Sequence, residues 1–248
     1  MNLQGRRLLV SGAAGGIGTA VARRLTAEGA VVGVTDLDLS KVTQLARGLS
    51  EAVGFACDLS MAGEAERLVD DVEEQIGPLD GLVHCAAVGK SVAMLDCTLE
   101  VWSEMLAVNL TATFDLCQAV AKRLVKKRSG VLVALASGAG IRPNAANVPY
   151  GAAKAGVIGL IRSAAIDLAP FGVRANVLIP GPTQTPLMRQ IAGAAVPLLT
   201  ARTMLGRLGQ PDEIAAVAAF LVSDQARYMT GSVLFADGGF SNSGVDFR

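Results

Sequence analysis

Short apolar runs alternate with stretches of helical periodicity along the whole chain, and this alternation constrains the fold more than any other feature. The runs lie at residues 7–11, 30–35, 53–57, 81–85, 130–136, 173–178 and 232–235. Most are continuously apolar, as parallel strands are when helices cover both faces of their sheet. Between them, Ile17, Val21 and Leu25 repeat every four residues, which predicts a helix with one buried face. We therefore predict an α/β fold, with a doubly wound parallel sheet of about seven strands and helices on both faces.

The chain has 248 residues without a repeat or a linker-like segment, so we expect a single domain over 1–248. Lys plus Arg and Asp plus Glu are 22 each, which leaves no basic excess to neutralise nucleic-acid phosphates. No apolar stretch approaches the roughly 18 residues of a membrane-spanning helix. Ser11 and the glycines after it end the apolar run that follows Arg6 and Arg7, unlike a signal peptide. We expect a cytoplasmic protein that binds neither nucleic acid nor membrane.

Four cysteines are scattered without a C-x-x-C pair, and His84 is the single histidine. Metal sites need clustered thiolate, imidazole or carboxylate ligands, so no metal is expected. His84 and Cys85 are neighbours at the end of a predicted strand, and their side chains should point to opposite faces of the sheet. We interpret the histidine and the cysteines as buried structural residues.

A glycine-rich segment connects the first predicted strand to the first predicted helix. It reads Ser11-Gly12-Ala13-Ala14-Gly15-Gly16-Ile17-Gly18. Glycines let the backbone turn sharply and approach a diphosphate closely, and the free N–H groups at a helix start attract phosphate. Because the segment lies between a strand and a helix, it favours dinucleotide binding on a Rossmann-like sheet over an ordinary tight turn.

Asp36 follows the second predicted strand, 18 residues after Gly18. A dinucleotide site has a carboxylate about 20 residues after its glycines, which accepts the hydroxyls of the adenosine ribose. That carboxylate would repel the extra phosphate of NADP, and no Arg or Lys stands at 37–40 to attract it. The pattern favours NAD. The alternative is a surface-turn aspartate, followed by a second one at Asp38.

Tyr150 and Lys154 are four residues apart at the start of a predicted helix, so their side chains share one face. A nearby ammonium favours the phenolate form, and we therefore expect Lys154 to lower the pKa of Tyr150 toward neutrality. Ser137 ends the fifth predicted strand, at the carboxyl edge of the sheet where ligands bind. A Tyr-x-x-x-Lys pair alone is common by chance, but the three residues together predict acid–base chemistry.

The chain resembles the short-chain dehydrogenase/reductase family, in its short single-domain branch. The resemblance covers nearly the whole chain. It rests on the glycine segment with Gly12, Gly16, Ile17 and Gly18, on Asp58-Leu59, Asn109, Ser137, Tyr150 and Lys154, and on Pro180-Gly181 with Thr185. One departure stands after the fourth strand, where the family's Asn-Asn-Ala-Gly is His84-Cys85-Ala86-Ala87. The small Ala86 and Ala87 still leave room for the cofactor.

The resemblance implies a role for each residue of the site. Tyr150 would exchange a proton with the substrate oxygen while hydride moves between the substrate carbon and the nicotinamide, and Ser137 would hold that oxygen. Lys154 would bind the nicotinamide ribose, and Asn109 would hold a helix irregularity and a water. Asp58 and Leu59 would lie near the adenine, and Pro180, Gly181 and Thr185 would lie near the nicotinamide.

The segment 183–208 should cover the substrate. Leu187, Met188 and Ile191 would line an apolar pocket or form the buried face of a short helix, and both interpretations stay open. Arg142, in the loop after Ser137, would meet an anionic substrate or lie in solvent. We expect an NAD(H)-dependent oxidoreductase for an apolar secondary alcohol or ketone. The alternatives are a 3-oxoacyl-carrier-protein reductase, which usually uses NADPH, and a non-catalytic dinucleotide-binding protein.

The resemblance also implies a homotetramer, in which helices at 103–127 and 150–169 pair across a two-fold axis. Small residues on these helices would permit close approach between copies. They are Ala112, Ala119, Ala152, Ala155, Gly156 and Gly159. The alternative is that they pack inside one copy.

Overall fold

The computed structural model describes residues 1–242, except for the side chains of 191 and 192. Two predictions lie outside the described residues. One is that the Ile191 side chain lines a substrate pocket, and the other is that the domain extends over residues 243–248.

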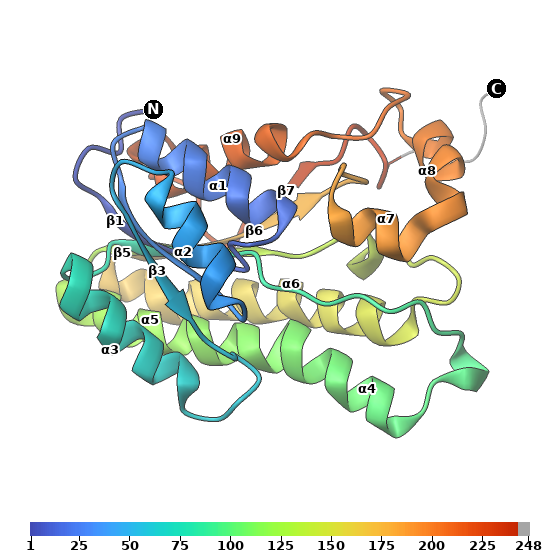
Figure 1. Ribbon diagram of the computed structural model, residues 1–248, viewed down its shortest axis with the longest axis horizontal. Coiled ribbons are helices and arrows are strands. Elements are labelled where there is room, and N and C mark those ends of the chain that lie inside the picture. The colour runs from blue at the N-terminus through green and yellow to red at the C-terminus, as the bar shows by residue number, and fades with distance from the viewer. Residues whose placement is uncertain (243–248) are drawn as a thin grey trace.

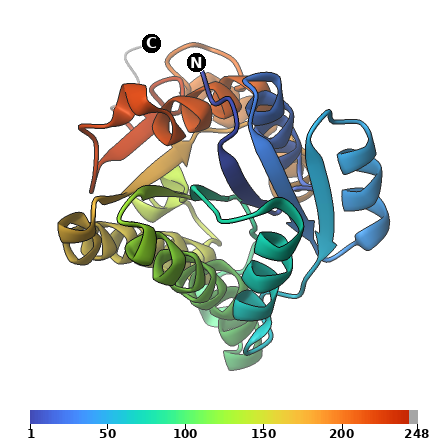
Figure 2. The same ribbon diagram turned by 90° about the vertical axis from the view of Figure 1, so that its left-hand side faces the viewer.

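Seven parallel strands form one sheet in the order β3-β2-β1-β4-β5-β6-β7, which confirms the predicted doubly wound fold. The strands are β1 (Arg7–Ser11), β2 (Val31–Asp36), β3 (Ala52–Ala56), β4 (Gly81–His84), β5 (Gly130–Leu135), β6 (Val173–Pro180) and β7 (Val233–Ala236). Figure 2 shows β3 near one edge of the sheet and β7 at the other. The strand order reverses between β1 and β4, and such sheets bind ligands outside the carboxyl ends of the strands at that point.

Helices cover both faces of the sheet, as Figure 1 shows. They are α1 (Gly16–Ala27), α2 (Leu39–Arg47), α3 (Glu64–Ile76), α4 (Leu99–Leu106), α5 (Ala112–Lys127), α6 (Val148–Leu168), α7 (Pro186–Ala192), α8 (Val196–Arg202) and α9 (Pro211–Val222). One apolar core joins α1, α2 and α9 to the sheet, and a second core joins α3, α5 and α6 to its other face. The short α7 and α8 belong to the segment that follows β6, and Figure 1 shows them together at one end of the molecule.

The division into two cores follows from the alternation of side chains along a strand. In β1, Leu8 and Val10 belong to the core under α1, and Leu9 belongs to the core under α5 and α6. Ser11 shares the parity of Leu9, so its side chain faces α5 at the point where β1 ends. On this face of the sheet, β1 therefore ends in the polar residue Ser11, directly before Gly12 of the glycine-rich segment.

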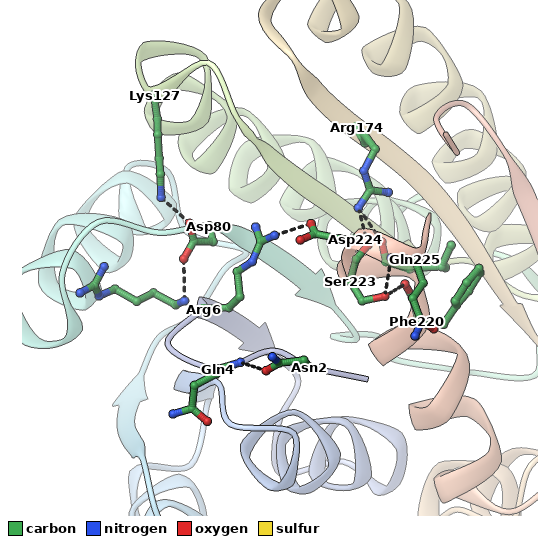
Figure 3. Close-up of polar contacts among 12 residues, drawn as sticks. Asn2, Gln4, Arg6, Asp80, Lys127, Arg174, Phe220, Ser223, Asp224 and Gln225 are labelled. Atoms are coloured by element: carbon green, nitrogen blue, oxygen red, sulfur yellow. Dashed lines mark hydrogen bonds and ion pairs between the residues drawn. The ribbon is translucent and has the colours of Figure 1, made fainter. Parts of the chain in front are cut away.

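Polar contacts fasten the amino ends of the strands, at the edge opposite the expected site (Figure 3). The Arg6 guanidinium pairs with Asp224, and Lys127 pairs with Asp80. Arg174 donates from Nη2 to the carbonyls of Leu221 (2.9 Å) and Ser223 (3.3 Å), so its cation satisfies carbonyls at the end of α9.

The structure corrects several details of the sequence interpretation. The helix expected from residue 103 begins at Leu99, and a π-helical turn over Ala107–Thr111 separates α4 from α5. Ala112 and Ala119 are buried within one copy and do not lie on an exposed face, and Ala119 belongs to the core between α5 and the sheet. Cys85 and Cys97 are half-buried, whereas Cys57 and Cys117 are buried as expected. Within 1–242, no helix combines the length and the apolarity needed to cross a membrane.

Candidate active site

The glycine-rich segment packs closely against the end of β4, and its glycines are required by these contacts. Gly12 has φ +65°, and a Cβ there would lie 2.5 Å from the Ala86 backbone nitrogen. A Cβ on Gly18 would lie 2.1 Å from the Gly12 carbonyl oxygen. The N-cap of α1 is Gly15, so no side chain caps the helix, and its first turn carries no acidic residue. The N–H groups and the positive end of α1 are thus available to an anion.

The Asp36 carboxylate is held beside this loop by two backbone amides. Its Oδ2 accepts from the Ala14 N–H at 3.0 Å, and its Oδ1 accepts from the Leu37 N–H at 2.8 Å. Asp36, Asp58 and Leu59 line one cavity of about 230 Å³ together with Gly12, Gly16, Ile17, Gly18, Ala86 and Ala87. Of the described residues that line it, none is Arg or Lys. The buried Thr35 hydroxyl, which also lines this cavity, has no hydrogen-bond partner among the described residues.

Ser137, Tyr150 and Lys154 converge at the carboxyl end of β5. Ser137 follows the strand directly, and its Oγ accepts from the Ala139 N–H at 3.2 Å. Tyr150 lies in the first turn of α6 and shares a side-chain hydrogen bond with Ser137. Lys154 lies one turn later, and its Nζ donates to the Leu135 carbonyl at 3.0 Å and lies 5.8 Å from the centroid of the Tyr150 ring.

Burial dominates the electrostatics of this group. It raises the pKa of Tyr150 above its usual value, and the hydrogen bond with Ser137 only partly offsets the increase. The expectation that Lys154 lowers the pKa of Tyr150 toward neutrality is therefore wrong. Burial also lowers the pKa of Lys154 to about 8, because the ammonium is removed from water.

A second cavity of about 230 Å³ lies next to the first, and Ser137, Tyr150 and Lys154 line it. Apolar side chains of Leu187, Met188, Leu199 and Phe240 line it, together with the amides of Asn144 and Asn147. Pro180, Gly181 and Thr185 line it as well. The two cavities share Ile17, Cys85, Ala87, Thr185 and Leu187. They therefore form one continuous groove with Asp36 toward one end and Tyr150 toward the other.

Asn109 is buried in the π-helical turn and lines neither cavity. Its Nδ2 donates to the carbonyls of Val88 and Met105, both at 3.0 Å, and its Oδ1 accepts from the Val88 N–H at 3.2 Å. Asn109 thus fixes the loop after β4, which contains Ala86 and Ala87, to the irregular turn. The helix irregularity that the resemblance implied is present at this position.

Sequence reasoning missed Thr35, Asn144, Asn147 and Phe240, which all line the groove. Thr35 comes directly before Asp36, so its place in the sequence is a usable signal. The other three lie in loops or near the carboxyl end, and neither their spacing nor their type distinguishes them. Arg142 does not line the groove, and its backbone N–H donates to the Gly138 carbonyl at 2.8 Å.

Comparisons with known proteins agree with this geometry. A family model described as enoyl-(acyl carrier protein) reductase matches residues 12–241. A 3-oxoacyl-acyl-carrier-protein reductase of Thermotoga maritima is 34% identical, over 96% of this chain and 99% of that protein. A D-threitol dehydrogenase of Mycolicibacterium smegmatis is 36% identical, over 96% of this chain and 94% of that protein.

A solved structure extends the agreement to three dimensions. The crystal structure of a short-chain type dehydrogenase/reductase from Mycobacterium marinum is 30% identical to this chain and has a TM-score of 0.92. The match covers 96% of each chain. The identities and coverages show that this chain belongs to the short-chain dehydrogenase/reductase family of oxidoreductases.

Proposed function

We propose that the protein is an NAD(H)-dependent oxidoreductase that interconverts a small secondary alcohol and a ketone. One observation carries this proposal: a single groove joins Asp36, beside the glycine segment, to Ser137, Tyr150 and Lys154. A dinucleotide has two ends, and this groove offers a carboxylate to one end and acid–base groups to the other.

The groove fits a nicotinamide dinucleotide. The close approach at Gly12 and Gly18 leaves no room for a side chain at these two positions, and the uncapped start of α1 would bind the diphosphate. Asp36 would accept the adenosine ribose hydroxyls, with Asp58 and Leu59 near the adenine. Lys154, Tyr150, Ala86, Ala87, Pro180, Gly181 and Thr185 would hold the nicotinamide half. When bound, the cofactor supplies or accepts the hydride.

The chain's own residues handle the proton. Tyr150 transfers a proton between its phenol oxygen and the substrate oxygen, and Ser137 donates a hydrogen bond that holds the substrate oxygen at Tyr150. Lys154, with a pKa of about 8, holds a titratable proton one helical turn from Tyr150. Asn109 holds the turn and the loop after β4 in register with the groove.

Charge supports NAD over NADP. Asp36 and Asp58 line the adenosine end of the groove, and a phosphate on the ribose would lie among carboxylates in a cavity without a basic side chain among its described lining residues. The apolar lining at Leu187, Met188, Leu199 and Phe240 supports an apolar substrate, with Asn144 and Asn147 available to a second polar group.

A second candidate is reduction of a 3-oxoacyl-acyl-carrier protein, the activity in the name of the Thermotoga maritima relative. NADPH would be the cofactor of this second candidate. One observation favours it. Arg23 and Lys41 line a separate hollow. This hollow is also lined by Ala14, whose backbone N–H donates to Asp36. If the side chain of Arg23 or Lys41 turned toward Asp36, it would give the extra phosphate of NADPH a cationic partner.

A substrate panel with NADH and NADPH offered separately tests both candidates. Small ketones, polyols and a 3-oxoacyl thioester are supplied in parallel, and we expect turnover of ketones with NADH. Asp36→Ala should narrow the preference for NADH over NADPH in fluorescence titrations, because repulsion of the phosphate is removed. Tighter binding of NADPH by the wild type would contradict the cofactor proposal. Binding of NADH without turnover of any substrate would indicate a non-catalytic dinucleotide-binding protein.

We also propose that four copies of the chain assemble into a homotetramer through the face formed by α4, α5 and α6. That face exposes large apolar side chains, Leu99 and Phe114 among them.

A further inference from the structure

The buried imidazole of His84 bridges Ser11, at the start of the glycine segment, and Thr113 of α5. His84 is the last residue of β4 and pairs in register with Ser11, the last residue of β1. Its Nδ1 lies 2.7 Å from the Ser11 Oγ, and its Nε2 lies 3.0 Å from the Thr113 Oγ1 of α5. All three residues are fully buried. The imidazole therefore spans from the start of the glycine segment to the helix that follows the π-helical turn.

The hydrogen-bond pattern fixes where the imidazole carries its proton. Thr113 Oγ1 donates its only hydrogen to the Asn109 carbonyl at 2.9 Å, so it must accept from His84 Nε2–H. His84 Nδ1 is then the acceptor for the Ser11 hydroxyl. Burial, together with the charge of Lys154, lowers the pKa of His84 to about 3, which keeps the ring neutral. The donors all point one way, from Ser11 through His84 and Thr113 to the Asn109 carbonyl.

The two ends of this chain of bonds have different tasks in the groove. Ser11 immediately precedes Gly12, whose backbone touches Ala86 where the dinucleotide would bind. Asn109 clamps Val88 and so fixes the loop that contains Ala86 and Ala87. A displacement at the glycine segment would thus move the Ser11 hydroxyl, the donor of a buried hydrogen bond to His84. A neutral buried network resists that change because unpaired groups are costly.

We propose that His84 is a positioning residue that couples cofactor binding at the glycine segment to the geometry of the Asn109 turn. This inference rests on the proposed dinucleotide site. It assigns to His84 no contact with cofactor or substrate, because His84 lines neither cavity.

The proton position is measured first, on the wild-type protein without cofactor. Because the chain has one histidine, a nitrogen-15 NMR spectrum of the imidazole contains a single pair of ring-nitrogen signals. We expect the neutral form with the hydrogen on Nε2. A neutral ring with the hydrogen on Nδ1, or a protonated ring at neutral pH, would overturn the proposal.

The coupling is measured by NADH affinity in Ser11→Ala, Thr113→Val and the double variant. Each single change should raise the Kd of NADH by about 3- to 30-fold, and the double change should raise it little more than the larger single change, because both break one network. In a His84→Leu background, the two changes should have no coupling. Thr26→Val is the matched control, since Thr26 is also a buried threonine bonded to the carbonyl four residues before it, at the far end of α1. It should leave the Kd of NADH unchanged.

The proposal would be overturned if the double variant raised the Kd of NADH by the product of the two single increases. This comparison is made in the wild-type background, so it does not depend on whether His84→Leu folds. Neither readout depends on turnover. A wild type that binds NADH and converts no substrate would contradict the proposed reaction while leaving the proton position and the coupling measurable. Turnover by the wild type with independent effects of the two changes would contradict only the role of His84.

Discussion

At the scale of single residues, Tyr150 is the group whose removal should separate chemistry from binding. Tyr150→Phe keeps the ring and its packing and removes only the phenol oxygen that shares a hydrogen bond with Ser137. A group in general acid–base catalysis contributes about 100- to 10,000-fold, so kcat should fall by at least 100-fold. The Kd of NADH should change little, because Asp36 and the glycine segment are untouched. Near-normal turnover of the variant would remove Tyr150 from the mechanism.

The burial of Lys154 predicts how the folding stability of the protein depends on pH. Its pKa is about 8 in the folded protein against 10.5 ordinarily, so below pH 8 both the folded and the unfolded chain hold the proton and the full cost of burying the ammonium is present. Between pH 8 and 10.5 the unfolded chain binds the proton more strongly, and the contribution of this group to folding stability rises with pH. The cost at neutral pH is on the order of 3 kcal/mol.

Lys154→Met removes this cost and keeps a similar volume. We expect its Tm to exceed that of the wild type at pH 7 and the difference to shrink at pH 10, as measured by thermal denaturation. Lys122→Met, which removes an exposed lysine, is the control and should show no such trend. If the difference in Tm between Lys154→Met and the wild type stayed constant from pH 7 to pH 10, the lowered pKa of Lys154 would be contradicted.

Among residues, sequence predicts the convergence of Ser137, Tyr150 and Lys154 well and their electrostatics poorly. The end of a strand and a four-residue spacing on a helix are both local patterns, and the structure places the three side chains at one cavity. The direction of the Tyr150 pKa depends on how much surrounding chain excludes water, which no local pattern contains. Asn144 and Phe240 were not found for the same reason, since their positions depend on tertiary packing.

At the scale of elements, the strands follow the apolar runs closely, and β1 has the predicted bounds. The π-helical turn at Ala107–Thr111 was implied by the resemblance at Asn109 and not by periodicity, because one extra residue barely changes an apolar pattern. Ala112 and Ala119 are buried inside one copy, which is the alternative that the sequence left open for these small residues.

The segment 183–208, which we expect to cover the substrate, contacts other residues of the groove through Arg202, at the end of α8. Its guanidinium lies 5.1 Å from the centroid of the Phe240 ring, and Nη1 donates to the Asn144 Oδ1 at 3.2 Å. Arg202→Ala removes a cation–π contact and a charge-assisted hydrogen bond, together worth about 1 to 2 kcal/mol. We expect the KM of the ketone to rise by about 5- to 30-fold, because α8 then closes the cavity less well.

The Kd of NADH should stay unchanged in Arg202→Ala, because the adenosine end of the groove lies elsewhere. Arg189→Ala, an exposed residue of α7 in the same segment, is the matched control in steady-state kinetics. Equal effects of the two substitutions on KM would indicate a general effect of charge on the segment and would contradict the role of Arg202.

At the scale of the whole molecule, the sheet order explains why distant residues share one groove. The chain turns to opposite sides of the sheet after β1 and β4, so the loops that follow these strands separate and leave a cleft at their carboxyl ends. Asp36, Ser137 and Pro180 follow or end other strands and reach the same edge. The alternating runs predict a parallel sheet, and parallel strands place all their carboxyl ends at one edge, so the residues that follow several strands were expected there. The order of the strands comes from the structure.

The homotetramer is the prediction that belongs to this scale. Leu99 (78% exposed) and Ile166 (75% exposed) lie on α4 and α6, and a Cβ on Gly159 would meet no atom within 4 Å. Ala152 and Ala155 are exposed on the same helix, in agreement with the expected interface, and apolar and small residues together permit close packing against a second copy. Light scattering at micromolar concentration should give about four times the 25.4 kDa chain mass.

Gly159→Arg should dissociate the assembly without unfolding the chain, because the new side chain has open space within one copy and would clash only with a partner. Leu39→Glu, at an exposed apolar residue of α2 (57% exposed) on the other side of the sheet, is the control and should leave the mass unchanged. A wild type that scatters as a lone 25.4 kDa species, or a Gly159→Arg protein that keeps the full assembled mass, would contradict the proposed interface.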